Sequence, residues 1–588
     1  MLELTSAGRP VHLSPGTSVQ LELNSPLFDA DVIKGAFSYS FGVPAAPNGP
    51  LYGYPERPDA GGSGGPLPAE LADDGLPLLA GTQRVGTASP SKYSVSVQGG
   101  LSGASLSERQ LSSFRYGGLR EVPRLVDVDG YQVPGLVLHA GEVVASPADY
   151  DYVFAPLRNE YVPEGSTLPP ADPLDFPGTS SVNAWLVSEA PIYGLPAGGS
   201  FLYRTGSSVL NGYCPFPKLR YVLQAICEES GLAVDLAGLL PGELGDLVVA
   251  GNAQLVDRGD AQTFRFSLAD VVPALTVAEL LAALRQDLGI VLYVETQGQR
   301  ARTAYLVERV AAEAAYVDLT SRLAAYPEAT LADPAGRTLT YAVDSADALT
   351  KDLLDQQPAA ALVLPAVARA TDLPATATAD EQPLTGQVRL VQETGTYYQC
   401  TVSYPAAGVY ALAWAELADS LPQVAVHGGG DEQAQQLCYT KLLPTRLLLN
   451  PSSPVTMLVP ALSQPPYRAD QSAVERSGAL RLLFYNGLQL ASDGVSPYPQ
   501  LSTVSASGAL SLRLTGTRGT YARLLEAWLA VQLQGSSYKQ PLLLTSLDLA
   551  RLDVTQPLRL DGVAYLVRKL TATVPLRKPA SLELVRLP

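Results

Sequence analysis

Histidine and cysteine are scarce in this chain of 588 residues, which has 3 His and 4 Cys. No two cysteines have the Cys-x-x-Cys spacing and no two histidines stand four residues apart, so the pattern of a zinc site is missing. Four cysteines are also too few to form the disulfide framework of so long a chain. The cysteines are Cys214, Cys227, Cys400 and Cys438. We therefore expect no metal, no cofactor and free, mostly buried thiols.

Charged side chains and long apolar runs are scarce as well. Charged residues make up 16% of the chain, and the 57 acidic and 40 basic side chains give a formal net charge of −17. Nucleic-acid binding and docking on anionic lipid both need an excess of cations, which this chain lacks. No run of 18 apolar residues is present, and the first residues lack the cationic and apolar parts of a secretory signal. We expect no membrane-spanning segment.

Glycine (51), proline (48) and tyrosine (29, against 11 phenylalanines) are abundant. Short alternating runs between turn residues, such as those at 19–23 and 93–97, predict a loop-rich protein dominated by β-strands. Residues 59–80 are rich in Gly, Ala and Pro and are expected to form an exposed insertion, and 43–58 to form a Pro-rich loop. Residues 355–385 are rich in Ala, Thr and Pro and are expected to form a linker.

Helices and a hairpin are predicted from local signals. Thr276 and Glu279 form a capping box, in which each side chain satisfies a free backbone amide at the start of a helix. Asp561-Gly562 between alternating apolar residues predicts a two-residue hairpin, because both turn positions need a positive φ. Apolar periodicity predicts helices over 218–230, 276–288, 431–443 and 521–533, and a last strand over 582–587.

These patterns predict an α+β, β-rich multidomain protein in which β-barrel-like domains contain inserted small α+β modules. The expected parts are an N-terminal β-rich barrel-like domain with long loops (1–210), α+β insertion modules (211–354), the linker (355–385), a second β-rich domain (386–515) and a C-terminal helix and β-hairpin completing a barrel (516–588).

Two strings match hydrolase motifs. Residues 61–65 read Gly-Gly-Ser-Gly-Gly, the nucleophile pattern G-x-S-x-G with Ser63 at its centre, and residues 427–430 read His-Gly-Gly-Gly, an oxyanion string. However, a nucleophile elbow requires a strand before the serine and a helix after it, whereas Ser63 lies in a Gly-rich stretch. No histidine follows His427 to serve as the base. We interpret the Gly-rich string as a flexible linker.

Other candidates for chemistry are also better explained as structure. The acidic pairs Asp149/Asp151 and Asp73/Asp74 are expected to be solvated turn or strand residues, because adjacency does not define the geometry of a glycosidase. The tryptophans Trp185, Trp414 and Trp528 are expected in cores. We predict no catalytic, cofactor-binding or metal-binding residue, and we expect that the protein is not an enzyme.

Three segments resemble the hub proteins of phage tail tips and baseplates, a trimeric family of contractile and long-tailed phages and related injection systems. The stretch from Asn24 to Arg57 is similar to N-terminal segments of tail proteins in phages and prophages of Bacteroidetes-type hosts. The helix–Gly–strand pair at 222–232 and 280–293 resembles the small modules inserted in hub proteins. The stretch from Tyr521 to Leu587 resembles the closing barrel of a hub. The insertions at 59–80 and 355–385 depart from the family pattern.

The resemblance implies a structural virion protein of the tail tip, assembled in the host cytoplasm. Such a hub is a homotrimer that joins the tail tube to the central spike or fibres and forms part of the DNA exit channel. The implied partners are a tail tube or distal tail protein, a spike or fibre and the tape-measure protein, with DNA passing but not specifically bound. Two alternatives stay open: a secreted or surface β-rich adhesin or binding protein, and a tail-associated hydrolase.

Overall fold

The computed structural model describes the chain from residue 1 to residue 588, apart from a set of internal gaps. The gaps are 29–34, 61–64, 101–105, 129, 160, 162–180, 187–199, 202–211, 296–299, 312–314, 332–336, 341–346, 348–362, 379–386, 392–395, 407–408, 417–423, 427–432, 437–444, 450–455, 466, 471–474, 492–493, 515–516 and 534–535. The described residues form a β-rich α+β structure of several lobes, so the predicted fold class is confirmed.

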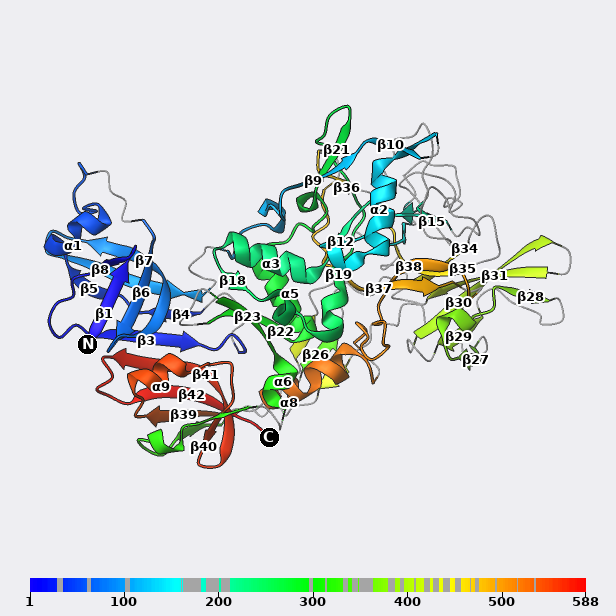
Figure 1. The fold of residues 1–588 in the computed structure, drawn as a ribbon. Coiled ribbons are helices and arrows are strands. Elements are labelled where there is room, and N and C mark those ends of the chain that lie inside the picture. Colours follow the sequence, from blue (N-terminus) through cyan, green and yellow to red (C-terminus); the bar gives the residue numbers. More distant parts are fainter. Residues whose placement is uncertain are drawn as a thin grey trace.

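The largest sheet has 14 strands and uses both ends of the chain (Figure 1). Its strands are β1 (Leu2–Ser6), β2 (Arg9–Pro10), β3 (Val19–Asn24), β4 (Ala36–Ser38), β5 (Phe41–Pro44), β6 (Leu67–Asp73), β7 (Leu76–Ala88), β8 (Lys92–Gly99), β24 (Val317–Asp318), β25 (Glu328–Thr330), β39 (Ser537–Leu542), β40 (Leu558–Leu560), β41 (Val563–Val574) and β42 (Ala580–Arg586). The hydrogen-bonded order is β2-β1-β6-β7-β8-β4-β3-β41-β42-β39-β25, with β5 on β8 and with β40 joining β41 to β24. In Figure 1 the blue and red parts of this sheet form two adjacent lobes at one end of the molecule.

The two lobes are joined by the antiparallel pairing of β3 with β41, which we call the seam. The register runs from Val19 opposite Val574 to Asn24 opposite Lys569. The predicted alternation in β3 is confirmed, since Val19, Leu21 and Leu23 are buried. One hydrophobic core continues across the seam from the N-terminal strands to β41 and β42.

Two Asp-Gly hairpins shape the lobes. The predicted turn at Asp561-Gly562 is confirmed: it joins β40 to β41, with φ values of 48° and 80°. A second Asp-Gly turn at Asp74-Gly75 joins β6 to β7, with φ values of 53° and 75°. Most of the segment 59–80 therefore differs from the exposed insertion that was expected, because 67–80 supplies paired strands with buried leucines.

Short helices cover the two terminal lobes. Helix α1 (Ala45–Tyr52) replaces part of the Pro-rich loop expected at 43–58, and it ends at Gly53, whose φ is 70°. Helix α9 (Ser546–Arg551) begins at a capping box formed by Thr545 and Asp548. Both helices contribute buried residues to the core of the sheet.

The middle of the chain forms a central lobe (Figure 1). It contains the largest hydrophobic core among the described residues. The predicted helices are confirmed as α3 (Leu219–Glu229) and α5 (Val277–Leu288), the latter with the capping box at Thr276 and an end at Gly289. The lobe also contains β9 (Leu119–Pro123), β10 (Leu125–Val128), β11 (Tyr131–Pro134), α2 (Gly135–Ala145), β12 (Tyr152–Val153), β15 (Trp185–Leu186), β16 (Ser200–Phe201), β17 (Phe216–Pro217), β18 (Ala233–Val234), α4 (Leu236–Leu239), β19 (Leu247–Val249), β20 (Ala253–Gln254), β21 (Thr263–Ser267), β22 (Ile290–Val294), β23 (Arg300–Tyr305), α6 (Leu306–Val310), β36 (Tyr467–Arg468), β37 (Leu482–Leu490) and β38 (Pro497–Ser502).

A nine-stranded sheet forms the lobe at the far end of the molecule (Figure 1). It consists of β13 (Leu157–Asn159), β14 (Ser181–Val182), β27 (Val363–Val367), β28 (Thr376–Thr378), β29 (Val388–Val391), β30 (Thr396–Ala406), β31 (Val409–Glu416), β34 (Thr445–Leu449) and β35 (Thr456–Leu462). Within the segment expected to be a linker, β27 and β28 are paired strands, and Ala370 and Leu373 between them are buried.

Two further helix predictions differ from the structure. The helix expected over 431–443 is wrong, because Gln433–Gln436 is strand β33, which pairs in parallel with β26 (Arg337–Thr340) beside β32 (Val424–Val426). The helix expected over 521–533 is present, but Tyr521–Leu525 is a π-helical turn before α8 (Glu526–Leu533). No helix among the described residues is long and apolar enough to cross a membrane.

Candidate assembly surface

Exposed apolar side chains gather along one end of the 14-stranded sheet. We define the edge patch as Leu323, Tyr326, Leu331, Leu543 and Leu547, which are 37%, 95%, 79%, 56% and 42% exposed. These are five of the thirteen large apolar side chains exposed in the described part of the chain. Isolated exposed apolar residues are ordinary, whereas several of them along one edge of a sheet are a candidate interaction surface.

Backbone pairing brings the edge patch together from two distant parts of the sequence. Leu323 forms a bridge with Leu542, and the Leu543 amide donates a hydrogen bond of 2.8 Å to the carbonyl of Arg322. Thr330, next to Leu331, lies opposite Ser537. The residues of the patch therefore follow the outer side of β39 and continue onto α9.

Strand β25 is the last strand of the sheet at this edge. It pairs with β39 and with no other strand that the structure describes, and its three residues are all exposed. A free edge presents unpaired backbone donors and acceptors that can accept another strand. The edge patch therefore combines apolar surface with free backbone groups, which is a combination suited to a protein partner.

An ion pair fixes the segment that leads to β25. Arg322 Nε lies 2.9 Å from Asp548 Oδ2, and the same carboxylate accepts the capping hydrogen bonds of Thr545. Although burial opposes its ionisation, these hydrogen bonds hold the pKa of Asp548 below its usual value. The edge patch is thus anchored to helix α9.

The seam contains a buried carboxylate. Glu22 on β3 is 6% exposed, and it accepts hydrogen bonds from Tyr39 Oη at 2.6 Å, from Asn24 Nδ2 at 3.1 Å and from Lys569 Nζ on β41 at 2.8 Å. Burial raises the pKa of Glu22, but the three donors more than offset it, so the pKa lies below its usual value. The Glu22–Lys569 pair therefore links the two lobes by charge as well as by backbone pairing.

The acidic pairs named from the sequence have structural partners. Asp151 forms an ion pair with Arg120 at 3.1 Å, and Asp73 accepts a hydrogen bond of 2.8 Å from Ser546 on α9. Asp74 is a hairpin turn residue and pairs with the amino group of Met1. The two pairs lie in different lobes and the structure does not bring them together.

The tryptophans and the described cysteines belong to cores. Trp185, Trp414 and Trp528 are each 5% exposed or less, as expected. Cys214, Cys227 and Cys400 are free and buried. Burial raises the pKa of Cys227 to about 12 and that of Cys400 to about 11, so these thiols are protonated at neutral pH.

The motif residues Ser63 and His427, and also Cys438, lie outside the described residues. Among the described residues, no three His, Cys, Asp or Glu side chains gather to hold a metal ion. The sequence reasoning missed the edge patch, because β25 is only three residues long and the parts of the patch lie more than two hundred positions apart. Nothing in the surrounding stretch, Leu-Ala-Ala-Tyr-Pro-Glu-Ala-Thr-Leu at 323–331, marks Tyr326 and Leu331 as exposed side chains.

Comparisons with known proteins give little further information. No family model and no curated protein matches the chain. Among solved structures, it is similar to the 43 kDa tail protein of prophage MuSo2 from Shewanella oneidensis, with a TM-score of 0.32 and 9% identity over 100% of this chain and 98% of that one. A TM-score this low does not establish a shared fold.

Proposed function

We propose that this chain is a structural protein of a phage tail, the hub of the tail tip or baseplate. The observation that carries the proposal is the sheet built from both chain ends, whose free edge at β25 is flanked by the apolar side chains of the edge patch. A sheet that stops at an apolar edge is well suited to contact another copy of the same chain. Contacts of this head-to-tail kind generate a closed ring when the rotation between neighbours allows it.

The proposed ring is a homotrimer. The N-terminal and C-terminal parts of the sheet form two lobes (Figure 1). Three copies of the chain would therefore present six lobes around one axis. Six lobes match a sixfold tube on one side, while the threefold ring matches a central spike or fibre on the other. The sequence resemblance to hub proteins supports this arrangement. The proposed partners are the tail tube or distal tail protein, the spike or fibre and the tape-measure protein.

The proposed role includes passage of DNA without catalysis. The formal charge of −17 per chain makes the assembled ring strongly acidic. An acidic channel wall repels phosphate and keeps DNA from adhering. In this role the protein is a component of the virion tail tip that is assembled in the host cytoplasm.

The mass of the full-length protein in solution tests the proposal. Size-exclusion chromatography with light scattering is expected to give the mass of a trimer for the protein alone. If the protein alone is a monomer, it is expected to form a trimer when purified tail tubes are added. A protein that stays monomeric under both conditions contradicts the hub. Measurable hydrolysis of purified murein contradicts the proposed absence of catalysis and supports the tail-associated hydrolase instead.

A further inference from the structure

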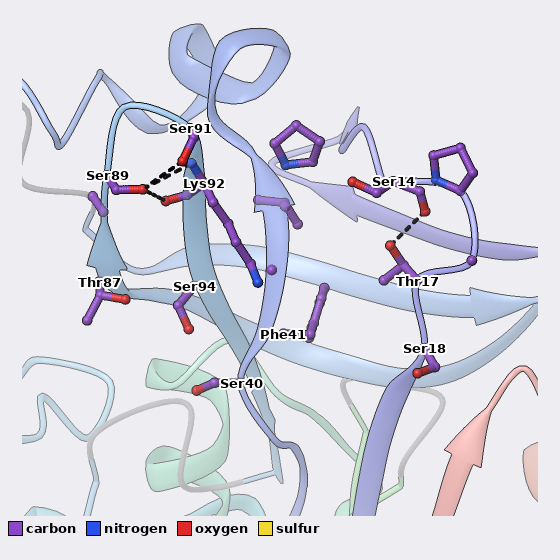
Figure 2. A pocket seen from close by; sticks show the side chains of 16 residues that line it. Ser14, Thr17, Ser18, Ser40, Phe41, Thr87, Ser89, Ser91, Lys92 and Ser94 are labelled. Carbon is purple, nitrogen blue, oxygen red and sulfur yellow. Dashed lines mark hydrogen bonds between the residues drawn. The ribbon is translucent and has the colours of Figure 1, made fainter.

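A hollow in the N-terminal lobe is lined by hydroxyl groups (Figure 2). Its volume is about 780 Å³, within the range of small-molecule sites. Three separate segments line it: the loop before β3, the junction of β4 with β5, and the turn between β7 and β8. Side-chain hydroxyls come from Ser14, Thr17, Ser18, Ser40, Thr87, Ser89, Ser91 and Ser94.

Lys92 is the one charged residue among those that line this hollow. Figure 2 shows its side chain directed across the hollow, with labelled hydroxyl groups on both sides of it. Its ammonium group forms no ion pair or hydrogen bond with any residue that the structure describes. In a chain with a net charge of −17, a lysine without an acidic neighbour is a selective point of attraction for an anion.

Gly42 on β5 makes room for this lysine. A side chain at position 42 would overlap the Lys92 stem, which lies directly over the Gly42 backbone. The φ of Gly42 is not positive, so the backbone does not require glycine there. Because glycine has no side chain, it instead leaves the space that the Lys92 stem occupies in the hollow.

The hydroxyl groups divide into two sets. Thr17 donates to the Ser14 carbonyl at 2.7 Å, and Ser89 donates to the Lys92 carbonyl at 2.9 Å, so these hydroxyls hold the loops in shape. The hydroxyls of Ser18, Ser40 and Ser94 have no hydrogen-bond partner among the described residues. Each of them can donate one hydrogen bond and accept two.

We propose that this hollow binds an anionic saccharide, with Lys92 pairing to a phosphate or carboxylate group and Ser18, Ser40 and Ser94 bonding to the sugar hydroxyls. A bare oxyanion fills only a small part of the volume. Hydroxyl side chains suit a polyhydroxylated ligand, because both partners can donate and accept. This inference does not depend on the proposed hub function.

Calorimetric titration of the full chain tests the proposal with four probes. Glucose 6-phosphate and glucuronate represent the two anionic forms, and glucose and inorganic phosphate represent each half of the ligand alone. We expect at least one anionic sugar to bind with a dissociation constant below about 10 mM and more tightly than both glucose and phosphate. Absence of binding by both anionic sugars overturns the proposal. Equal affinity for phosphate alone overturns the saccharide part.

Three variants test the assigned residues. Lys92→Gln is expected to weaken binding about tenfold or more, since a charge-assisted hydrogen bond is lost. Gly42→Ala keeps the charge but displaces the lysine stem, and it is expected to weaken binding as well. The matched control is Lys578→Gln, which removes an exposed lysine in the loop between β41 and β42. Full binding by the Lys92 variant, or an equal loss in the control, contradicts the assignment.

Discussion

Glu22 is a charged residue that is buried within a strand, where an apolar side chain is usual. Its carboxylate is buried in the seam and receives hydrogen bonds from Tyr39, Asn24 and Lys569. Replacement by Gln removes the charge but keeps the shape, so it isolates the electrostatic contribution to the contact between the lobes.

We expect Glu22→Gln to destabilise the seam by about 2 kcal/mol at pH 7, because hydrogen bonds to a charged group are weakened and Lys569 loses its anion. Hydrogen exchange of the β3 and β41 peptides is the measurement, and faster exchange confined to these peptides is the expected result. Glu70→Gln, at an exposed position of strand β6 in the same sheet but away from the seam, is the control. Unchanged exchange at the seam in the Glu22 variant contradicts the assigned role.

The same carboxylate gives a pH dependence. Since the pKa of Glu22 in the folded protein lies below its usual value of about 4.5, its stabilising contribution is complete above about pH 4.5 and disappears as the pH falls through the folded pKa. The stability difference between wild type and Glu22→Gln should therefore be constant near neutral pH and shrink in acid. Urea denaturation at several pH values measures it. A difference that grows in acid contradicts the depressed pKa.

At the scale of the elements, the sequence was sufficient to predict those helix ends and turns that depend only on residues close together in the chain. Three such features can be predicted from the sequence because each involves only a few neighbouring residues. They are the capping box at Thr276, the glycine that ends this helix at position 289 and the Asp561-Gly562 turn. The hairpin at Asp74-Gly75 carried the same signal, but the surrounding Gly- and Pro-rich composition concealed it. The strand at 433–436 was misread because its parallel partner, β26, lies about a hundred residues away.

The Asp561-Gly562 turn makes a prediction at this scale. Gly562 has a φ of 80°, and a β-carbon there meets no atom within 4 Å, so its substitution by Ala causes backbone strain without a clash. We expect Gly562→Ala to destabilise the C-terminal lobe by about 1–2 kcal/mol, measured as a lower urea midpoint. Gly86→Ala is the control and is expected to be near neutral, because φ is not positive there and a β-carbon would meet only the Ser94 carbonyl oxygen, at 3.8 Å. Equal effects of the two changes contradict the turn geometry.

The whole molecule depends on pairings that local patterns do not determine. The β-rich class followed from composition and alternation, but the seam joins strands more than five hundred residues apart. β24 and β25 were expected within the α+β modules, yet they extend the terminal sheet. The edge patch arises from these distant pairings, and therefore no part of the sequence reveals it alone.

The edge patch predicts the behaviour of the assembly. Tyr326→Ser together with Leu331→Ser is expected to weaken self-association by tenfold or more, since burying each side chain contributes about 1.5–3 kcal/mol. Mass photometry over a dilution series measures the shift from trimer to monomer. Val495→Ser, at an exposed apolar residue outside the patch (77% exposed), is the control. A trimer that is equally stable in the double variant places the contact elsewhere.

The seam also has a consequence for biosynthesis. Strand β3 is complete after 24 residues, but its partner β41 is made only when residues 563–574 are translated. At roughly 5–20 residues per second, the ribosome needs about half a minute to two minutes to cover that interval. During this time strand β3 of the N-terminal lobe lacks its partner, and its apolar side chains, which are buried in the folded protein, are exposed. An unpaired apolar strand of this kind can pair with other chains and cause aggregation. Folding of this sheet therefore waits for the synthesis of residues 563–574, and chaperone protection of the nascent N-terminal lobe should raise the yield of correctly assembled protein.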